Sequence, residues 1–332
     1  MIDTLKKFPL LRWIMAIPGV ANTYHHLFAR RAAGKFGFPS RKIFTIGITG
    51  TKGKTTTIEL LNAILEAAGK KTAICSSMRV KVGTEVEKNS SNNTMPGRAF
   101  IQYFLSRAVK AGCKYALIEV TSQGVAQSRH KFIDWKIGAL TNLQPEHIEA
   151  HGSFEKYRAA KFSFLKYVAE QGGAVFLNSD DKNSGYFRER LSGAHVFFKK
   201  DEDFNRVLPH ESPMHSFSKQ LQQKIFLSEF NLENIALAVL IAKHIGIDMQ
   251  TIKLALENFK GVPGRMNVVV ESPFLVIVDY AHTPDSLRAV YKSLQELKSK
   301  TSNLIAVLGA AGGGRDKWKR YLMGKIDRKS VV

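Results

Sequence analysis

The stretch at residues 45–57, TIGITGTKGKTTT, which contains a glycine-rich turn, restricts the fold of this chain more than any other feature. An apolar run leads into it, and apolar residues at helical spacing follow it, so we expect a strand, a loop and a helix in succession. Gly50 and Gly53 let backbone N–H groups turn toward an anion, Lys54 can reach the outer phosphates of a nucleotide, and the Thr55 hydroxyl can bind Mg²⁺. The loop therefore predicts a nucleotide phosphate site.

Composition favours a soluble globular protein with anionic partners. The chain has 332 residues, 44% of them hydrophobic, which is enough for two or three domains with buried cores. Its 49 Lys and Arg against 28 Asp and Glu give a formal net charge of +21, which favours nucleotides, nucleic acid or a membrane surface. Nucleotides fit best, because the basic residues are scattered and the sequence has neither zinc-finger spacing nor a basic and aromatic RNA-binding motif.

Cysteine use and the N-terminus favour a cytoplasmic protein. Cys75 and Cys113 are the only cysteines, too few for a disulfide framework or a cysteine-built zinc site. Arg12 and Pro18 interrupt the apolar N-terminal stretch well short of the ~20 residues of a membrane span, and no small-residue cleavage site follows. We expect an amphipathic helix packed on the body of the protein, with shallow membrane contact as the alternative.

Short apolar runs alternate with helical patterns between residues 71 and 178, which predicts a mostly parallel sheet flanked by helices. Ligands of such sheets bind at the carboxyl ends of the strands. The polar residues that follow the expected strands are Glu119, Thr121, Ser122, Asn142, Glu146, His147, Asn178, Asp180 and Asp181. A carboxylate and an imidazole beside a triphosphate are candidate ligands for a second Mg²⁺, although Mg²⁺ prefers oxygen ligands.

A second region begins near Pro263. Residues 274–298 are expected to form a strand, a loop and a helix, and residues 303–326 a strand, a glycine-rich loop and the start of a helix. The GAAGGG sequence in that loop fails the dinucleotide-binding pattern, and the basic residues after it suit an anionic group better. This is too little sheet for an independent α/β domain, so we expect a domain that is cut short.

The sequence resembles the Mur ligase family over roughly residues 43–326. The resemblance rests on stretches that occur in the family's order, namely GITGTKGKTTT, IEVTSQG, TNLQPEHIEAHGSFEKYRAAK, LNSDD, FNLENIALAV, GVPGRM, VIVDYAHTPDSL and GRDKWKRYLMG. It implies an α/β fold in which a P-loop central domain with a mostly parallel sheet precedes an incomplete Rossmann-like C-terminal domain. The expected boundaries are 1–42 for a helical segment without a full UDP-binding domain, 43–262 for the ATP-binding domain and 263–332 for the apparently truncated ligase domain.

The resemblance also implies roles for individual residues. ATP is expected to contact Gly50, Thr51, Lys52, Gly53, Lys54, Thr55, Thr56, Asn142, Asp180, Asn231, Asn234, Arg265, Asp279 and His282. The residues expected to carry catalysis are Lys54, Glu119, His147, Lys161 and Arg265. Magnesium, as two ions, is expected on Thr55, Glu119, His147 and Lys161, the last once CO₂ has converted its amine to a carbamate. Substrate is expected at Asn93, Thr94, Thr121, Ser122, Arg129, Arg315 and Lys319.

The activity implied is ATP-dependent amide formation through an acyl phosphate, adding the third residue of the peptidoglycan stem peptide to UDP-MurNAc-dipeptide. The expected enzyme is a cytoplasmic monomer that acts on small molecules and binds no nucleic acid. Two departures from the family stand out, since only about 42 residues precede the first strand and the segment that selects diaminopimelate or lysine would lie beyond Val332. The alternatives are a ligase similar to folylpolyglutamate or cyanophycin synthetase, an ATP-binding fragment without activity and, from charge alone, a nucleic-acid binder.

Overall fold

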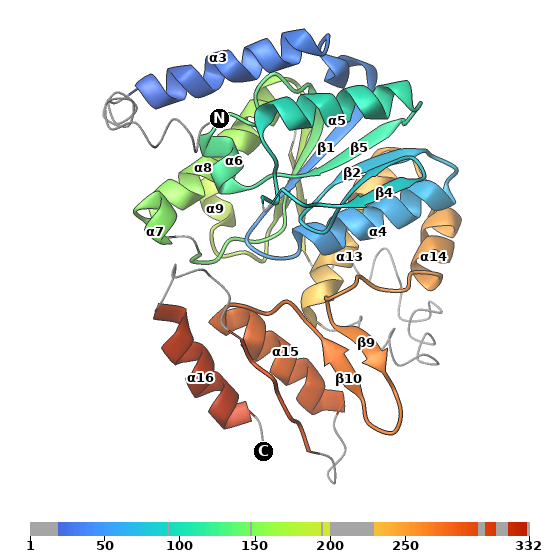
Figure 1. The fold of residues 1–332 in the computed structure, drawn as a ribbon, viewed down its shortest axis with the longest axis vertical. Helices are drawn as coiled ribbons and strands as arrows, with labels where there is room; N and C mark the ends of the chain where they lie inside the picture. The colour runs from blue at the N-terminus through green and yellow to red at the C-terminus, as the bar shows by residue number, and fades with distance from the viewer. Residues whose placement is uncertain are drawn as a thin grey trace. The chain divides into compact units, whose positions relative to one another are not determined.

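The computed structural model describes residues 19–91, 93–146, 148–193, 195–199, 229–297, 303–309 and 318–330 (Figure 1). The chain divides into two compact units. The first comprises Met1–Ile58, Ala68–Leu143 and Arg158–Phe197, and the second comprises Glu59–Ala67, Gln144–Tyr157 and Phe198–Val332. Two of the expected site residues, His147 and Arg315, lie outside the described residues.

The first unit is built on a large sheet, which has eight strands within the described ranges, in the order β4-β3-β2-β5-β1-β6-β7-β8. The strands are β1 Phe44–Thr49, β2 Thr72–Cys75, β3 Arg79–Val82, β4 Glu85–Lys88, β5 Tyr115–Glu119, β6 Trp135–Leu140, β7 Ala174–Asn178 and β8 His195–Phe198. β1 pairs in parallel with β5 and β6, while β3 joins β2 and β4 antiparallel. The expectation of an α/β protein with a mostly parallel sheet is confirmed.

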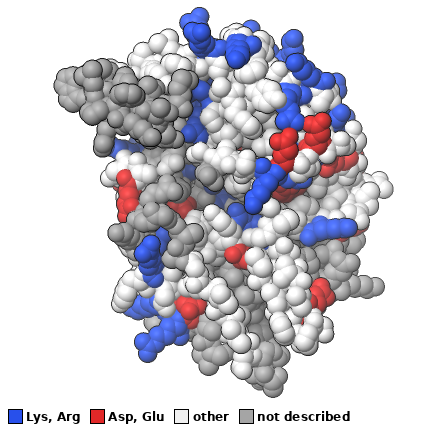
Figure 2. Space-filling view, in the orientation of Figure 1, with Lys and Arg blue, Asp and Glu red and all other residues white. Residues whose placement is uncertain are grey.

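Helices connect most of these strands. Their bounds are α3 Val20–Lys35, η1 Pro39–Lys42, α4 Lys54–Ala67, α5 Arg98–Lys110, α6 Ser122–Ala126, α7 Ile148–His151, α8 Phe154–Glu170, α9 Ser184–Arg188, α13 Glu229–His244, α14 Met249–Glu257, α15 Pro284–Leu297 and α16 Trp318–Ser330. Among the described helices, none is long and apolar enough to cross a membrane. On the face drawn in Figure 2, Lys and Arg are spread over several separate places with Asp and Glu among them.

Strand β1 runs through the middle of the sheet and needs a glycine at its centre. A Cβ on Gly47 would lie 2.5 Å from Cζ of Phe164 and 2.8 Å from Cζ3 of Trp135. These two rings meet edge to face with their centroids 5.2 Å apart, and both are buried. The aromatic pair therefore packs directly on the backbone that leads into the glycine-rich loop.

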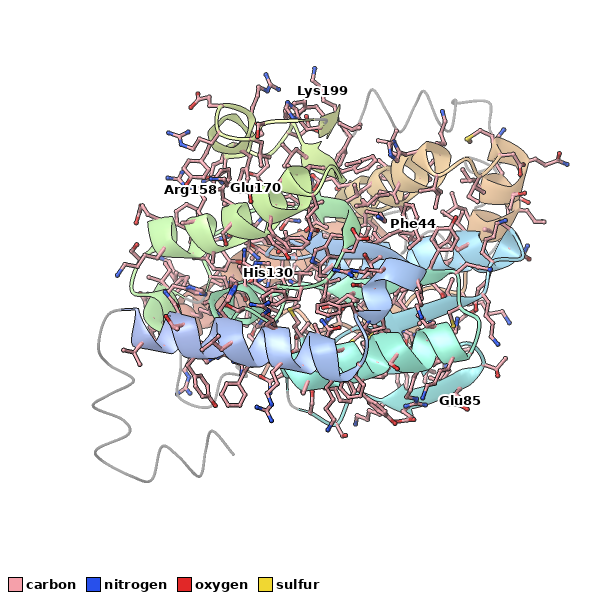
Figure 3. All side chains as sticks on the ribbon, turned by 90° about the horizontal axis from the view of Figure 1, so that it is seen from above. Phe44, Glu85, His130, Arg158, Glu170 and Lys199 are labelled. Carbon is pink, nitrogen blue, oxygen red and sulfur yellow. The ribbon has the colours of Figure 1, made fainter. Side chains whose placement is uncertain are left out.

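Helix α3 confirms the expected helix near the N-terminus, although residues 1–18 lie outside the described ranges. Its buried positions are the small residues Ala29, Ala32 and Ala33. Small side chains allow a close approach, and α3 packs against α5, which in turn packs on β2 and β3 (Figure 1). Seen from above in Figure 3, His130 lies among interior side chains, whereas Glu85 lies at the periphery.

The second unit includes an antiparallel pair of strands, β9 Asn267–Val270 and β10 Val276–Val278. Helices α15 and α16 pack together around a buried cluster of Met266, Leu287, Val290, Tyr291, Met323 and Ile326. The helix expected within residues 274–298 and the helix start expected at the end of residues 303–326 are confirmed as α15 and α16.

The strand expected at residues 303–309 is wrong, because these residues form no regular element. Leu304, Ala306 and Leu308 pack against the buried cluster, while Ile305 and Val307 are exposed. The alternation is that of an extended, half-buried segment, but a strand also needs a hydrogen-bonded neighbour, and these residues pair with no strand in the described part of the chain.

Candidate functional site

The glycine-rich loop connects β1 to α4, and residues at the end of β6 pack against it and form hydrogen bonds with it. Gly50 has φ of 147° and Gly53 has φ of 81°, conformations that favour glycine. A Cβ on Gly50 would lie 1.8 Å from Oγ1 of Thr141, so a side chain there is excluded by space as well as by backbone angle. The Thr141 hydroxyl donates to the Lys52 carbonyl at 2.5 Å. The loop and the end of β6 therefore fit together closely.

Asn142, expected to contact ATP, contacts the loop itself. Its carbonyl accepts from the Thr51 N–H at 2.9 Å, and its side-chain oxygen accepts from the Lys52 N–H, also at 2.9 Å. Its amide nitrogen donates back to the Lys52 carbonyl at 3.3 Å. Asn178, at the end of β7, supports this strand end in turn by donating to the Thr141 carbonyl at 3.1 Å. Asn142 therefore stabilises the loop directly, and Asn178 stabilises the strand end next to it.

Two lysines converge on the carbonyls of the loop. Lys54 Nζ donates to the carbonyls of Gly50 and Thr51, each at 2.9 Å. Lys161 Nζ, from α8, donates to the Gly50 carbonyl at 2.8 Å. Lys161 is only 1% exposed, so it is not a solvated helix lysine. A buried amine requires partners, and the loop supplies one.

The start of α4 meets the end of β5 through a short hydrogen bond. The Thr55 hydroxyl donates to Oε1 of Glu119 at 2.6 Å, and Glu119 is 1% exposed. Oε1 also accepts from the backbone N–H of Ser77 at 3.2 Å and from its hydroxyl at 3.4 Å. Sequence reasoning missed Ser77, whose signal is its position just after an apolar strand that neighbours β5.

The same pair of residues fits a divalent cation of the Mg²⁺ type. All the hydrogen bonds to the Glu119 carboxylate are made to Oε1, and no described residue donates to Oε2. A carboxylate oxygen beside a threonine hydroxyl is the kind of oxygen donor set that Mg²⁺ takes together with phosphate oxygens. Across the described ranges, no three His, Cys, Asp or Glu side chains gather in the manner of an all-protein metal cluster.

Cys75 lies at the end of β2, two residues before Ser77. Burial, with a smaller contribution from the nearby Glu119 carboxylate, raises the pKa of the Cys75 thiol to about 12. A thiol with this pKa stays protonated at neutral pH and is a poor nucleophile. Cys75 is therefore a poor candidate for a nucleophile.

A second set of strand-end residues lies after β7. Oδ2 of Asp181 accepts from the Leu143 N–H at 2.5 Å, and Asn183 donates to the Leu143 carbonyl at 3.1 Å. Asp180, expected to contact ATP, is exposed, and its N–H donates to Oδ1 of Asn178 at 2.9 Å. The structure thus holds the segment after β6 from two sides, through Asn178 and through Asp181.

Five of the residues expected to meet substrate form a separate group in the first unit, namely Asn93, Thr94, Thr121, Ser122 and Arg129. Thr121 caps α6 by accepting from the Gly124 N–H, and Ser122 is buried in the first turn of that helix. Asn93 is exposed and donates to the Ser91 carbonyl at 3.0 Å. Arg129 donates to the carbonyl of Met95, the residue after Thr94. The loop after α6 is therefore in contact with the segment that contains Asn93 and Thr94.

In the second unit, Glu146 brings two expected site residues together. Its Oε1 lies 3.1 Å from Nε2 of His282 and 3.7 Å from Nζ of Lys319, and Glu146 is 3% exposed. Asn231 and Asn234, both buried on α13, are joined by a hydrogen bond of 3.2 Å.

Asp279 and Arg265 lie on the chain segments next to His282. The Asp279 carboxylate accepts from the N–H groups of Met266 at 2.8 Å and Ala281 at 2.7 Å. The guanidinium of Arg265 lies over the ring of Tyr280, 4.4 Å from its centroid. Asp279 therefore fixes the turn that carries Tyr280 and His282.

Comparisons with known proteins all find similarity to the same family. The Mur ligase middle domain matches residues 48–242, and the Mur ligase, glutamate ligase domain matches residues 264–330. The UDP-N-acetylmuramoyl-L-alanyl-D-glutamate--2,6-diaminopimelate ligase of Halalkalibacterium halodurans is 34% identical over 310 residues, which cover 90% of this chain and 63% of the relative. This chain thus spans less than two thirds of that relative's length.

Two solved structures are similar in fold. A structure of a UDP-N-acetylmuramoyl-L-alanyl-D-glutamate--2,6-diaminopimelate ligase superposes with a TM-score of 0.63 at 26% identity, over 87% of this chain and 60% of that one. The apo form of L. casei FPGS superposes with a TM-score of 0.65 at 16% identity, over 92% of this chain and 82% of that one, a likeness of fold alone. Together with the two domain matches, these results show that the chain belongs to the Mur ligase family.

Proposed function

We propose that this chain is an ATP-dependent carboxylate-amine ligase that adds diaminopimelate, as the third residue of the stem peptide, to UDP-MurNAc-dipeptide. Family membership and the names of its relatives support the reaction class and the amino acid. The proposal places the enzyme in the cytoplasm, as a monomer acting on small-molecule substrates with Mg²⁺.

The observation that carries the proposal is the 2.6 Å hydrogen bond between Thr55 and Glu119. It joins the first turn of the helix after the phosphate loop to the end of a neighbouring strand, which is where a nucleotide-bound Mg²⁺ is held in phosphate-transferring enzymes. The buried Lys161, bonded to the Gly50 carbonyl, adds a third side chain next to the same loop. An ordinary structural turn would require neither the buried carboxylate nor the buried amine.

The proposed reaction proceeds in two steps. The substrate carboxylate attacks the γ-phosphorus of ATP, ADP leaves, and an acyl phosphate forms; the amine of the incoming amino acid then attacks the acyl carbon and releases phosphate. The loop amides and Lys54 hold the β- and γ-phosphates, so the chain contributes positioning and charge neutralisation rather than a nucleophile. Mg²⁺, when bound at Thr55 and Glu119, would neutralise charge on the transferred phosphoryl group.

We extend the proposal to the remaining expected residues. Lys161, as a carbamate, would offer oxygen ligands to a second Mg²⁺ together with His147, whereas its ammonium form would repel a cation. Arg265, Asp279 and His282 are assigned to ATP, with Asn231 and Asn234 on the adenine side. Arg315 and Lys319 are assigned to substrate.

The test is phosphate release from ATP by the purified chain, with and without UDP-MurNAc-dipeptide and either diaminopimelate or lysine. The variant is Lys54→Ala, and the matched control is Lys70→Ala, an exposed lysine just beyond the C-terminal end of the same helix. Release that requires both substrates, persists in the control and is lost in the Lys54 variant supports the ligase. ATP binding without release under any acceptor would overturn it in favour of a nucleotide-binding chain without ligase activity.

A second candidate is a ligase that acts on a folate acceptor. L. casei FPGS shares the fold, with a TM-score of 0.65 at 16% identity, so this acceptor stays the alternative to test. The same assay decides between them when folate and L-glutamate replace the cell-wall substrates.

A further inference from the structure

Two arginines and a histidine come together in the first unit. Arg98 is the first residue of α5, Arg129 follows α6, and His25 lies on the inner side of α3. Nη2 of Arg98 donates to Nδ1 of His25 and, at 3.4 Å, to the Gln127 carbonyl. Arg129 donates to the side-chain oxygen of Gln127 through Nη2 at 2.6 Å and through Nε at 3.2 Å. Both guanidiniums therefore share Gln127.

Within the part of the chain that the structure describes, no carboxylate pairs with either arginine. The acceptors that the two arginines use are an imidazole, an amide oxygen and two backbone carbonyls, and no described residue offers either of them a carboxylate. Nε of Arg98 is buried and has no hydrogen-bond partner. Burial lowers the pKa of Arg129, and the nearby positive charge of Arg98 lowers it further. Partly buried like charges that face one another destabilise the fold unless an anion joins them.

His25 does not supply a compensating charge. Burial, followed by the positive charges of Arg98 and Arg129, lowers the pKa of His25 to about 4. The ring is therefore neutral at neutral pH and serves as a hydrogen-bond acceptor for Arg98. Its effect is to orient the guanidinium, which also lies 5.9 Å from the centroid of the Tyr24 ring.

We infer that Arg98, Arg129 and His25 form one binding site for an oxyanion, a carboxylate or a phosphate, carried by the acceptor substrate. Guanidinium groups recognise both anions through paired N–H donors, and Nε of Arg98 is a donor still available for such a pair. The inference rests on the proposed function for the identity of the substrate. It deepens that function by adding Arg98 and His25, which were not among the residues expected to meet substrate, to Arg129.

The position of the site fits this role. Arg129 contacts Met95, the neighbour of Thr94, and Thr121 and Ser122 start the short helix that leads to Arg129. A substrate anion bound by the two arginines would therefore sit beside the other residues proposed to meet substrate. His25 brings α3 into the site, so the helix ahead of the sheet would contribute directly to binding.

The test compares Arg98→Gln with Arg107→Gln, an arginine on the same helix that pairs with Glu85 and Glu87. Calorimetry measures binding of UDP-MurNAc-dipeptide, UDP, inorganic pyrophosphate and the dipeptide L-Ala-D-Glu, and a thermal melt measures Tm with and without each ligand. We expect Arg98→Gln to weaken substrate binding about ten- to a hundredfold, the loss of one or two charge-assisted hydrogen bonds. The Tm of the free protein should stay level or rise, because a like-charge contact is removed. The Arg107 variant should bind substrate normally.

The four ligands show whether the bound anion is a phosphate or a carboxylate. A loss confined to UDP and pyrophosphate assigns the site to phosphate, and a loss confined to the dipeptide assigns it to a carboxylate. Unchanged affinity for all four ligands together with a lower Tm would overturn the inference, because Arg98 would then be purely structural. If the proposed ligase activity were wrong but this inference right, ligand binding would still depend on Arg98, while no phosphate would be released from ATP. Arg98→Lys should restore part of the affinity, since charge returns without the paired donors.

Discussion

Substituting alanine for Gly50 should destabilise the fold through two separable effects. The backbone at Gly50 has φ of 147°, which alanine adopts only under strain, and the new Cβ would lie 1.8 Å from Oγ1 of Thr141. That hydroxyl cannot move freely, because it donates to the Lys52 carbonyl at 2.5 Å. Either the loop or the end of β6 must therefore shift.

The expected loss of unfolding free energy is the sum of the backbone strain and the steric clash. Backbone strain at such a position costs of order 1–3 kcal/mol, and overpacking costs about 1–3 kcal/mol more, so Gly50→Ala should lose about 2–6 kcal/mol of unfolding free energy. Thr141→Ala alone should cost about 1–2 kcal/mol, for one hydrogen bond and one methyl group. In the double variant the 1.8 Å contact is removed, while tight contacts of 3.1 Å to Cβ of residue 141 and 3.2 Å to the Asn142 nitrogen remain, so the total should fall short of the sum by about 1–3 kcal/mol.

Urea unfolding of the four proteins, followed by tryptophan fluorescence, completes the cycle. Gly112→Ala is the matched control, since Gly112 also has positive φ, of 73°, but a Cβ there meets nothing within 4 Å. The Gly112→Ala variant should therefore lose unfolding free energy through backbone strain alone. The reasoning is refuted if Gly50→Ala costs no more than Gly112→Ala and its effect adds independently to that of Thr141→Ala.

Three further expectations follow from buried groups. Glu119→Gln keeps an oxygen for Thr55 and Ser77 but removes the charge, so phosphate release should fall at least about a hundredfold while the thermal melt changes little; equal activity would count against the magnesium assignment. Burial, with Lys131 nearby, lowers the pKa of His130 to about 3, below its value in the unfolded chain, so stability should be lost as pH falls from about 6.5 toward 3. His130→Phe should flatten that part of the pH profile of urea unfolding, and an unchanged slope would contradict the assignment. Cys75, with its pKa raised to about 12, should react with a thiol reagent only after unfolding, which a stopped-flow labelling experiment on Cys113→Ser would check.

The strand, loop and helix at the phosphate site could be predicted from sequence because each is coded locally. Apolar residues fill β1, glycine permits the positive φ of the loop, and apolar positions recur along α4. The same local signals predicted β5, β6 and β7, whose residues are almost all buried. Sequence reasoning is strong here because burial on both faces leaves a continuous apolar run.

The elements that were missed lack that signal. β3 and β4 have four residues each and no continuous apolar run, and all four residues of β4 are exposed, so neither was expected as a strand. Ser77 could be recognised only once β2 and β5 were known to be neighbours, which brings its N–H to Glu119. The pairing of Arg98 with Arg129 likewise depends on how α5 and the loop after α6 pack. These are tertiary facts, and spacing along the chain does not encode them.

The outcome for Asn142 shows how such tertiary facts change the meaning of a motif. A polar residue at the end of a strand beside a phosphate loop is a natural candidate for ligand contact, yet Asn142 uses its backbone and side chain to hold Thr51 and Lys52. If the loop binds phosphate as proposed, this bracing has a purpose, because amides that already point at the anion site lose less binding energy in becoming ordered than the amides of a flexible loop. Thr141 and Asn142 therefore shape the loop, and the contact of Asn142 with ATP stays a prediction, whereas Oε2 of Glu119 accepts no hydrogen bond from a described residue. Unused hydrogen-bonding capacity, rather than position alone, is what distinguishes a candidate ligand.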